Sequence, residues 1–419
     1  MLTYKIVTLG CKVNQYETQA LETFLEQRGC VRTEGLADVV IVNTCAVTAE
    51  SGRKSRQAIR HLAKENPGAR IAVCGCFSQL EPERLADLGC DIVYGTGNHE
   101  QLADAIVEGR KESFTDNPFQ RRIIEDLPAG AVDGRTRAMM KIQDGCDNFC
   151  TYCVIPFTRG RVRSLPMEEA AEQARGLETA GFREIVLTGI EIASYGKDLP
   201  GKPGLADVIQ AISAAAPGCR LHLGSLEPTA VTEEFCQKLA ACGNVCRHFH
   251  LSLQSGCDKT LKAMNRKYDS AFFRERCELL RSYFPLCSLT ADMIAGFPGE
   301  TEADFARSLD FIRECGLSFV HCFPYSERPG TKAASMPDRW PRAEKEGRVR
   351  QAAPVVAELR RQYAESCVGA CLRVLFETET SGHADNYEPV TVDTPQERGT
   401  VKNVQIRGFD GESLVGFVV

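Results

Sequence analysis

The chain has 419 residues, which is too long for one ordinary domain and predicts two or three. Its composition, 43% apolar and 25% charged residues, is typical of a water-soluble globular protein, and no stretch approaches the roughly 20 apolar residues that span a membrane. The formal net charge of −6 excludes a globally basic nucleic-acid-binding protein, so any attraction to a polyanion has to be local.

Cysteine is unusually frequent, with 20 residues. The first residues run directly into a strand-like pattern without the layout of a signal peptide, so we expect the protein in the cytoplasm. Reducing conditions there favour metal ligation over disulfides for cysteines that cluster. For most of the others, the role of a small buried apolar residue is sufficient.

Residues 1–115 alternate strand and helix signals. Apolar runs predict strands at 5–9, 38–42, 70–73 and 91–94, and amphipathic patterns predict helices at 15–28 and 50–64. This rhythm indicates an α/β domain of flavodoxin or Rossmann type with a parallel sheet. Three of the strands end in a turn that carries a cysteine, at Cys11, Cys45 and Cys76. Because the loops beyond the strand carboxyl ends line the ligand crevice of such sheets, the three residues can converge there.

A polar connection follows at 111–137, with Pro118, Pro128 and Gly134, and is predicted to be a linker. A second βα series occupies 135–335. Six βα units in a row predict a partial barrel of TIM type, with its chemistry at the carboxyl ends of the strands. Its strands are expected near 139–143, 184–188, 220–223, 248–253, 289–294 and 319–323, with helices between them that include 167–179 and 302–313. We expect a helical linker at 336–366 and a small all-β module at 367–419.

The most specific motif is C-x3-C-x2-C, formed by Cys146, Cys150 and Cys153 directly after the first strand of the second series. Three closely spaced thiolates can hold three irons of a 4Fe–4S cluster and leave the fourth iron without a protein ligand. A zinc site or a redox-active C-x2-C pair is the alternative, although the local sequence offers no fourth zinc ligand. Tyr152, just before the third cysteine, suits packing near an adenine or a place in the core.

This motif at the start of a βα barrel resembles the radical S-adenosylmethionine (SAM) superfamily. The resemblance implies that the open iron chelates SAM, and that reduction cleaves SAM to a 5′-deoxyadenosyl radical. The cofactor then supplies the difficult chemistry, while the barrel directs the radical and excludes water.

Within that superfamily the chain is similar to the methylthiotransferases over nearly its whole length. In that family three N-terminal cysteines hold a second, auxiliary 4Fe–4S cluster, and Cys11, Cys45 and Cys76 match them. Cys74 is a possible competitor of Cys76. The resemblance implies two SAM molecules, one to methylate a sulfur atom at the auxiliary cluster and one to generate the radical. Further matching stretches are 187–190, 250–256, 296–301 and 324–326.

Several matching residues lie at predicted strand ends. Thr188, Gln254 and Ser255 are candidates for contacts with SAM, and each could equally serve in a turn or in packing. The stretch 296–301 could also be an ordinary turn in which Thr301 caps a helix with Asp304 three residues later.

RNA binding is expected from the loop after the cysteine motif, where Arg159, Arg161 and Arg163 alternate with other residues. Arginine suits bidentate contact with phosphate, although a solvated loop is the alternative. In the family, the C-terminal β module is a TRAM domain that binds RNA. Here residues 368–419 contain four basic and eight acidic residues, which is a poor composition for a phosphate clamp.

The resemblance favours a tRNA modification enzyme that adds a methylthio group at C2 of N6-threonylcarbamoyladenosine at position 37. It implies as partners the tRNA anticodon stem-loop, an electron donor of flavodoxin or ferredoxin type and a sulfur source, with no membrane. Isopentenyladenosine in tRNA and an aspartate of a ribosomal protein are the alternative substrates. A non-enzymatic iron–sulfur carrier is a further alternative.

Overall fold

The chain folds into two compact units in the computed structural model, which describes residues 1–128 and 136–419. The described residues of the first unit are 1–128, 139–165 and 326–334, and those of the second are 136–138, 166–325 and 335–419. Residues 129–135 of the predicted linker lie outside the described residues.

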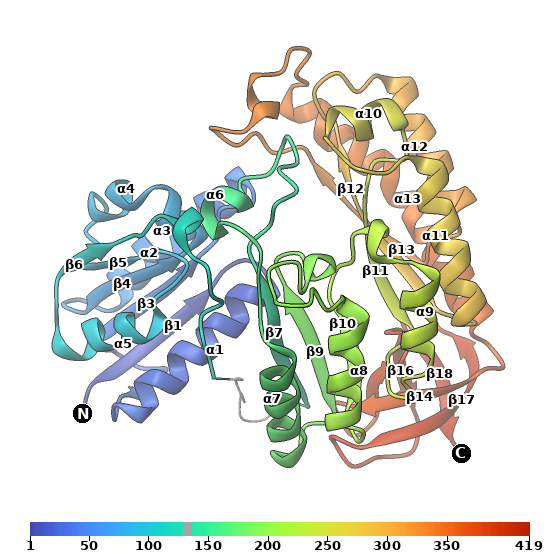
Figure 1. Ribbon diagram of the computed structural model, residues 1–419, viewed down its shortest axis with the longest axis horizontal. Helices are drawn as coiled ribbons and strands as arrows, with labels where there is room; N and C mark the ends of the chain where they lie inside the picture. The colour runs from blue at the N-terminus through green and yellow to red at the C-terminus, as the bar shows by residue number, and fades with distance from the viewer. Residues whose placement is uncertain (129–135) are drawn as a thin grey trace. The chain divides into compact units, whose positions relative to one another are not determined.

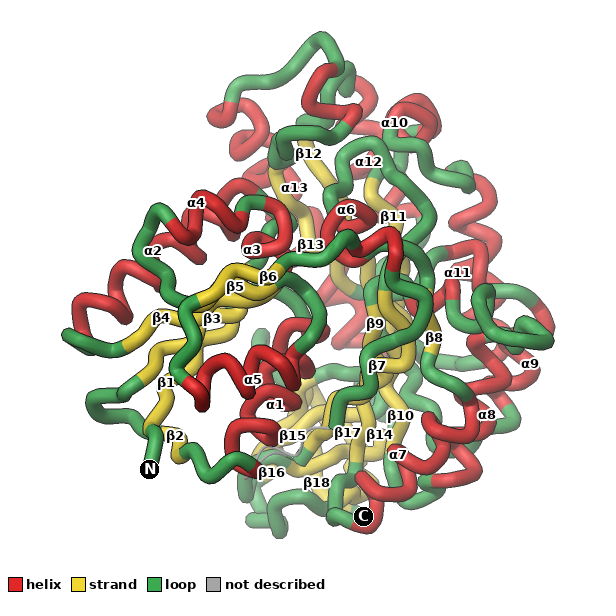
Figure 2. The backbone as a smooth tube through the Cα atoms, turned by 60° about the vertical axis from the view of Figure 1, so that its left-hand side comes forward, coloured by secondary structure: helices red, strands yellow, loops and turns green. Residues whose placement is uncertain are grey.

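The first unit is built on a six-stranded parallel sheet with the strand order β2-β1-β3-β4-β5-β6 (Figures 1 and 2). Its order reverses beside β1, which is the topological switch point where sheets of this type bind ligands. The strands are β1 Thr3–Thr8, β2 Val31–Arg32, β3 Val39–Thr44, β4 Arg70–Gly75, β5 Ile92–Tyr94 and β6 Glu112–Phe114. The helices are α1 Lys12–Gln27, α2 Ala49–Glu65, α3 Cys76–Leu80, α4 Pro82–Ala86 and α5 His99–Glu108, with a 3-10 turn at Pro118–Gln120.

Both faces of this sheet are covered, and the central strand β3 is buried along its whole length. Its residues alternate between two apolar cores because successive side chains of a strand point to opposite faces. Val39 and Ile41 pack with α1 and α5, whereas Val40 and Val42 pack with α2, α3 and α4. The predicted α/β domain with a parallel sheet is therefore confirmed.

Two strands of this sheet escaped the prediction. β2 has only two residues, and β6 lies inside the segment that was predicted to be a linker. β6 pairs with β5 through Ile92 and Glu112, although its own side chains are largely exposed. An edge strand of three residues with exposed side chains leaves almost no apolar pattern in the sequence.

The first unit also contains the loop that follows β7 (Arg137–Asp144), which is the first strand of the second βα series. β7 forms an antiparallel pair with the short strand β8 (Arg163–Ser164), and α6 (Ile155–Arg159) lies between them in sequence. The C-x3-C-x2-C motif therefore lies in the same compact unit as the six-stranded sheet.

The second unit contains the rest of the predicted barrel series. β9 and β10 pair in parallel, and β11, β12 and β13 form a parallel sheet. Every predicted strand of the series forms, so the α/β series is confirmed. The strands are β9 Glu184–Gly189, β10 Arg220–Leu223, β11 His248–Gln254, β12 Ser288–Ala295 and β13 Phe319–Pro324. The helices are α7 Met167–Thr179, α8 Leu205–Ala215, α9 Glu233–Ala240, α10 Asp258–Ala263, α11 Ser270–Tyr283, α12 Glu302–Glu314 and α13 Arg342–Ser366, with 3-10 turns at Ile192–Ser194 and Pro228–Ala230. A further 3-10 turn, Lys332–Ser335, lies almost entirely in the first unit.

The C-terminal module is a closed β barrel with the strand order β14-β15-β16-β18-β17, which confirms the predicted all-β module (Figure 1). Closure leaves no strand edge exposed. Its strands are β14 Cys371–Phe376, β15 Ser381–Ala384, β16 Pro389–Val392, β17 Val401–Phe409 and β18 Leu414–Val418. Within the described part of the chain, no helix is long and apolar enough to cross a bilayer.

Candidate active site

Cys11, Cys45 and Cys76 each follow a strand of the parallel sheet at its carboxyl edge. Cys11 follows β1, Cys45 follows β3, and Cys76 begins α3 after β4. The first two strands are neighbours at the topological switch point, and β4 is the next strand. Each of the three thiols raises the pKa of another one. Cys45 raises the pKa of Cys11, Cys76 raises the pKa of Cys45, and Cys11 raises the pKa of Cys76. The structure thus brings together three residues that are far apart in sequence.

Buried amide side chains hold this edge of the sheet in place. The Asn14 side-chain nitrogen donates to the carbonyl of Leu9 at 2.9 Å and to that of Thr44 at 3.0 Å. The Asn43 side chain donates in turn to the Asn14 carbonyl at 3.0 Å. The Cys11 thiol donates to the Asn14 side-chain oxygen at 3.6 Å. The turn after β1 is therefore fastened to the turn after β3.

Two glycines let the cysteine turns approach one another. Gly10 and Gly75 have φ values of +108° and +95°, a region that favours glycine. A Cβ atom on Gly10 would lie 3.0 Å from the Cys45 sulfur, and one on Gly75 would lie 2.4 Å from the Asn43 side-chain oxygen. A larger residue at either position would push the cysteine-bearing turns apart.

Cys74 takes no part in this group of turns. It lies on β4 and packs in the core beneath α1 and α5, whereas Cys76 belongs to the core on the opposite face. Burial raises the pKa of the Cys74 thiol well above its ordinary value. Its surroundings are those of a small apolar core residue.

Cys146, Cys150 and Cys153 occupy one loop after β7, and all three are partly exposed. Backbone amides surround their sulfur atoms. The amide of Asn148 donates to Cys146 Sγ at 3.5 Å, and that of Ile155 donates to Cys153 Sγ at 3.4 Å. Gly145, with φ +74°, precedes the loop, and a Cβ atom there would lie 1.8 Å from the Arg161 carbonyl oxygen. The loop therefore depends on glycine where it leaves the strand.

The donor chemistry of both triads fits iron–sulfur clusters, because all six side chains are cysteines that form no disulfide. No three cysteine, histidine or acidic side chains within residues 1–128 and 136–419 surround one metal-ion position.

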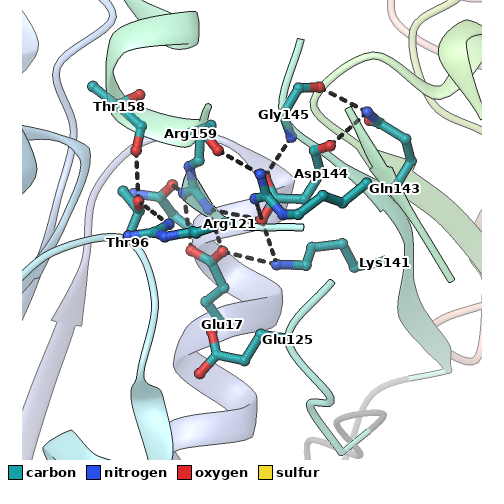
Figure 3. A network of polar contacts seen from close by, with 12 residues as sticks. Glu17, Thr96, Arg121, Glu125, Lys141, Gln143, Asp144, Gly145, Thr158 and Arg159 are labelled. Carbon is teal, nitrogen blue, oxygen red and sulfur yellow. Dashed lines mark hydrogen bonds and ion pairs between the residues drawn. The ribbon is translucent and has the colours of Figure 1, made fainter. Parts of the chain in front are cut away.

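A buried network of charges lies beside the sheet edge (Figure 3). Glu17 of α1 accepts from both Arg159, at the end of α6, and Lys141 of β7, the latter at 3.1 Å. Lys141 also pairs with Asp144 at 3.1 Å, and Arg163 pairs with Asp144 at 3.3 Å. None of the five side chains is more than 4% exposed. The network connects α1, which begins beside Cys11, to the segment that carries the second triad.

The network contains three cations and two carboxylates, so it has one positive charge in excess. Burial raises the pKa of the Cys76 thiol, and the Arg159 guanidinium beside it opposes that rise. Arg159 also donates to the Asn14 side-chain oxygen at 3.1 Å. The excess charge therefore lies where it can favour thiolates at the first triad.

Two family descriptions match the sequence. Residues 140–312 match the radical SAM superfamily, and residues 3–95 match the family described as Uncharacterized protein family UPF0004. Together they include both cysteine triads.

Curated relatives match most of the chain. A threonylcarbamoyladenosine tRNA methylthiotransferase MtaB of Bacillus subtilis is 39% identical over 93% of this chain and 90% of its own length. The chain belongs to the radical SAM methylthiotransferase family. The MtaB protein of Thermotoga maritima is 37% identical over 90% of this chain and 87% of its own length. A tRNA-2-methylthio-N(6)-dimethylallyladenosine synthase of Carboxydothermus hydrogenoformans is 35% identical over 83% and 82%.

A solved structure supports the fold of this methylthiotransferase. The radical SAM methyltransferase TsrM from Kitasatospora setae has a TM-score of 0.57 with 16% identity, covering 79% of this chain and 74% of its own. Radical SAM enzymes use SAM and a 4Fe–4S cluster, and methylthiotransferases carry two such clusters.

The four residues predicted to contact SAM lie in different structural elements and differ in burial. Tyr152 is half-buried in the cysteine loop of the first unit. Thr188 is buried at the end of β9, and Gln254 ends β11 with φ +68°. The Ser255 hydroxyl accepts from the Cys257 amide at 3.2 Å and contacts the Ser308 hydroxyl at 3.2 Å. Ser255 therefore has the local bonding of a turn residue.

The arginine loop departs from its predicted role. Arg159 is 0% exposed and Arg163 is 2% exposed, and both are engaged in the buried network, so neither guanidinium reaches a phosphate. Only Arg161 is exposed, at 54%, where it pairs with Asp147 at 3.1 Å. Burial thus argues against the prediction that all three arginines contact RNA. The three arginines occupy alternate positions, and the sequence did not indicate which of their side chains would be buried.

One other matching stretch, 296–301, and two residues that follow β11 have structural explanations. Thr301 caps α12, since its hydroxyl accepts from the Asp304 amide at 3.2 Å while Asp304 accepts from the Thr301 amide at 2.8 Å. This confirms the expected helix cap. Arg266 and Tyr268 brace the end of β11, with Arg266 donating to the Ser252 carbonyl at 3.1 Å.

Sequence reasoning missed Glu17, Lys141 and Asp144 of the buried network. One signal was present, because Asn14 and Glu17 follow Cys11 at spacings of three residues and therefore lie on one face of α1. A glutamate on the buried face of a helix that begins directly after Cys11 indicates a polar neighbourhood. Lys141 and Asp144 lie in a strand pattern and gave no comparable signal.

Proposed function

We propose that this methylthiotransferase adds a methylthio group to C2 of N6-threonylcarbamoyladenosine at position 37 of tRNA. The observation that supports it most strongly is the presence of two cysteine triads in one compact unit. A radical enzyme with a single cluster would need only one of them. The threonylcarbamoyl group is favoured because the two relatives of highest identity reported above are named for that substrate.

In this proposal Cys146, Cys150 and Cys153 hold the cluster that binds SAM, and Cys11, Cys45 and Cys76 hold the auxiliary cluster. When bound, these groups and two SAM molecules replace the C2 hydrogen by sulfur and methyl, with one SAM giving the methyl group and the other removing the hydrogen as 5′-deoxyadenosine. The protein's own residues hold the thiols and exclude water. Arg159 keeps a positive charge beside Cys76.

The proposed partners are the anticodon stem-loop of tRNA, an electron donor of flavodoxin or ferredoxin type, and a sulfur source. Arg161 supports RNA binding because it is an exposed cation in the loop after the second triad. The proposed SAM contacts are Tyr152, Thr188, Gln254 and Ser255. We propose a cytoplasmic location because tRNA is modified there.

The proposal is tested by nucleoside mass spectrometry. tRNA from a strain lacking this chain should contain threonylcarbamoyladenosine without its methylthio derivative, and the wild-type chain supplied on a plasmid should restore the derivative. Loss of the methylthio derivative of isopentenyladenosine instead would assign the other tRNA substrate. An unchanged tRNA profile with an altered ribosomal-protein aspartate would refute a tRNA function.

A further inference from the structure

One buried arginine differs from all the others in the described part of the chain. Four of the five have a carboxylate partner, in the pairs Arg159–Glu17, Arg163–Asp144, Arg220–Glu184 and Arg348–Glu300. Arg328 is 6% exposed, and among the described residues no carboxylate lies within 4.0 Å of it. Its Nε atom is buried without a hydrogen-bond partner.

A buried cation without a counterion is costly, because it loses hydration and gains no ion pair. Burial lowers the pKa of Arg328, and Glu81 and Cys45 only partly oppose this. Glu81 is already paired with Arg84 at 2.7 Å. A second cation, Arg56 of α2, also lowers the pKa of Arg328. The Arg56 guanidinium lies over the Phe77 ring, 5.5 Å from its centroid. Arg328 therefore has no carboxylate partner among the described residues, although Glu81 and Cys45 lie near enough to act on it.

The segment that carries Arg328 touches the surroundings of both cysteine triads. The Ser326 hydroxyl accepts from the amide of Ala49, the first residue of α2, four residues after Cys45. At the other end of the segment, the Ala333 amide donates to the carbonyl of Thr151, between Cys150 and Cys153, at 2.8 Å. These contacts lie within the first unit. The segment that carries Arg328 is thus fastened at one end to the loop after Cys45 and at the other end to the loop of the second triad.

We propose that Arg328 is a positioning residue that binds an oxyanion of the RNA substrate between the two triads. This inference rests on the proposed function, because the substrate must reach both triads. Its guanidinium can pair bidentately with either of two oxyanions of such a substrate, a backbone phosphate or the carboxylate of the threonylcarbamoyl group. The isopentenyl group carries no charge, so a carboxylate contact would also select between the two tRNA substrates.

The test uses the full chain with both clusters reconstituted and two anticodon stem-loop RNAs, one with threonylcarbamoyladenosine and one with plain adenosine at position 37. Arg328→Gln removes the charge, and Arg328→Lys keeps the charge without the planar fork. Arg60→Gln is the matched control, since Arg60 is an exposed arginine of α2. Equilibrium RNA affinity, KM and kcat, iron content and RNA-free SAM cleavage are measured for each variant.

We expect Arg328→Gln to weaken RNA binding and raise KM roughly tenfold or more, with Arg328→Lys between it and the wild type and Arg60→Gln within about twofold of the wild type. A loss confined to the threonylcarbamoyl RNA identifies the carboxylate as the ligand. An equal loss for both RNAs, with a shallower salt dependence, identifies a phosphate. Either result supports the inference.

Unchanged affinity and KM in Arg328→Gln with intact clusters would overturn the inference. Loss of iron or of RNA-free SAM cleavage would also overturn it, because Arg328 would then serve the clusters or the fold. The measurements of RNA affinity test the inference even if the wild-type chain forms no methylthio product. Such a chain would refute the proposed function, while a charge-dependent affinity would still support an oxyanion site at Arg328.

Discussion

The two cysteine triads are built in opposite ways. Cys146, Cys150 and Cys153 lie within eight residues of one partly exposed loop, whose shape depends on local backbone bonds. Cys11, Cys45 and Cys76 come from three strands and are brought together only when the parallel sheet forms. The triad of Cys146, Cys150 and Cys153 is thus a local structure, whereas the triad of Cys11, Cys45 and Cys76 depends on the fold and on a buried charge network. Damage to the sheet edge should therefore affect the auxiliary site selectively.

The largest effects are expected from the cysteines themselves. Cys150→Ala should abolish SAM cleavage and product formation, because it removes a ligand of the cluster that binds SAM. Cys45→Ala should abolish methylthiolation while RNA-free SAM cleavage continues. Anaerobic reconstitution with iron analysis, Mössbauer spectroscopy and a 5′-deoxyadenosine assay would measure these outcomes, and Cys74→Ala serves as the control. If Cys45→Ala stops cleavage as well, the two sites do not have separate roles.

The next largest effect is expected from Glu17→Gln, which leaves Arg159 and Lys141 buried with less compensating charge. Breaking a buried ion pair costs about 3–5 kcal/mol. We expect a lower free energy of unfolding and selective loss of iron from the auxiliary site. Glu50→Gln removes a carboxylate from the exposed pair with Arg53 and should cost less than about 1 kcal/mol. Equal stabilities for the two variants in chemical denaturation would contradict a structural role of the network.

The stability that Glu17 contributes should depend on pH in a defined direction. Burial raises the pKa of Glu17, but Arg159 and Lys141 outweigh it and lower the pKa to about 2. Because the folded pKa lies below the ordinary value, the stability that Glu17 contributes is present above pH 4.5 and is lost as the pH falls toward 2. In Glu17→Gln this part of the acid dependence should disappear.

A smaller effect is expected from the glycines of the sheet edge. Gly75→Ala forces a left-handed backbone on alanine, at about 1–2 kcal/mol, and adds a clash with the Asn43 side chain that typically costs about 1–3 kcal/mol. Gly89→Ala is the control, since Gly89 has φ +82° and no atom within 4 Å of an added Cβ. Thermal unfolding and iron content separate the two costs. If both variants lose the same stability and retain both clusters, close approach at Gly75 is not needed.

The local triad, the order of strands and helices along the chain and the all-β module could be predicted from the sequence, because each depends on neighbouring residues. It also placed Cys11, Cys45 and Cys76 at one sheet edge, since parallel strands bring their carboxyl ends together. The family resemblance, rather than spacing, distinguished Cys76 from Cys74. The structure adds a physical reason, because the two residues face opposite cores.

Burial of individual polar residues was beyond prediction. Arg159 and Arg163 had the pattern of an exposed RNA-binding loop, but their partners Glu17 and Asp144 come from other elements. Arg328 shows the opposite case, because no carboxylate among the described residues pairs with it although it is buried. Whether a charge is paired inside a protein depends on contacts between distant segments, which no single-sequence pattern reveals.

The smallest effect on stability is expected from Arg161→Ala, which tests what remains of the predicted RNA contact. Arg161 is exposed and pairs with Asp147, so its loss should change the free energy of unfolding by less than about 1 kcal/mol. If it contacts a phosphate, RNA affinity should fall for every stem-loop alike, and the salt dependence of binding should decrease by about one ion. Asp147→Ala is the matched control, because it breaks the same ion pair but leaves the cation free for RNA. Filter binding at several salt concentrations measures both variants. An unchanged salt dependence in Arg161→Ala would place the RNA elsewhere, and Arg328 would then be the remaining cation near the two triads with a proposed role in holding the substrate.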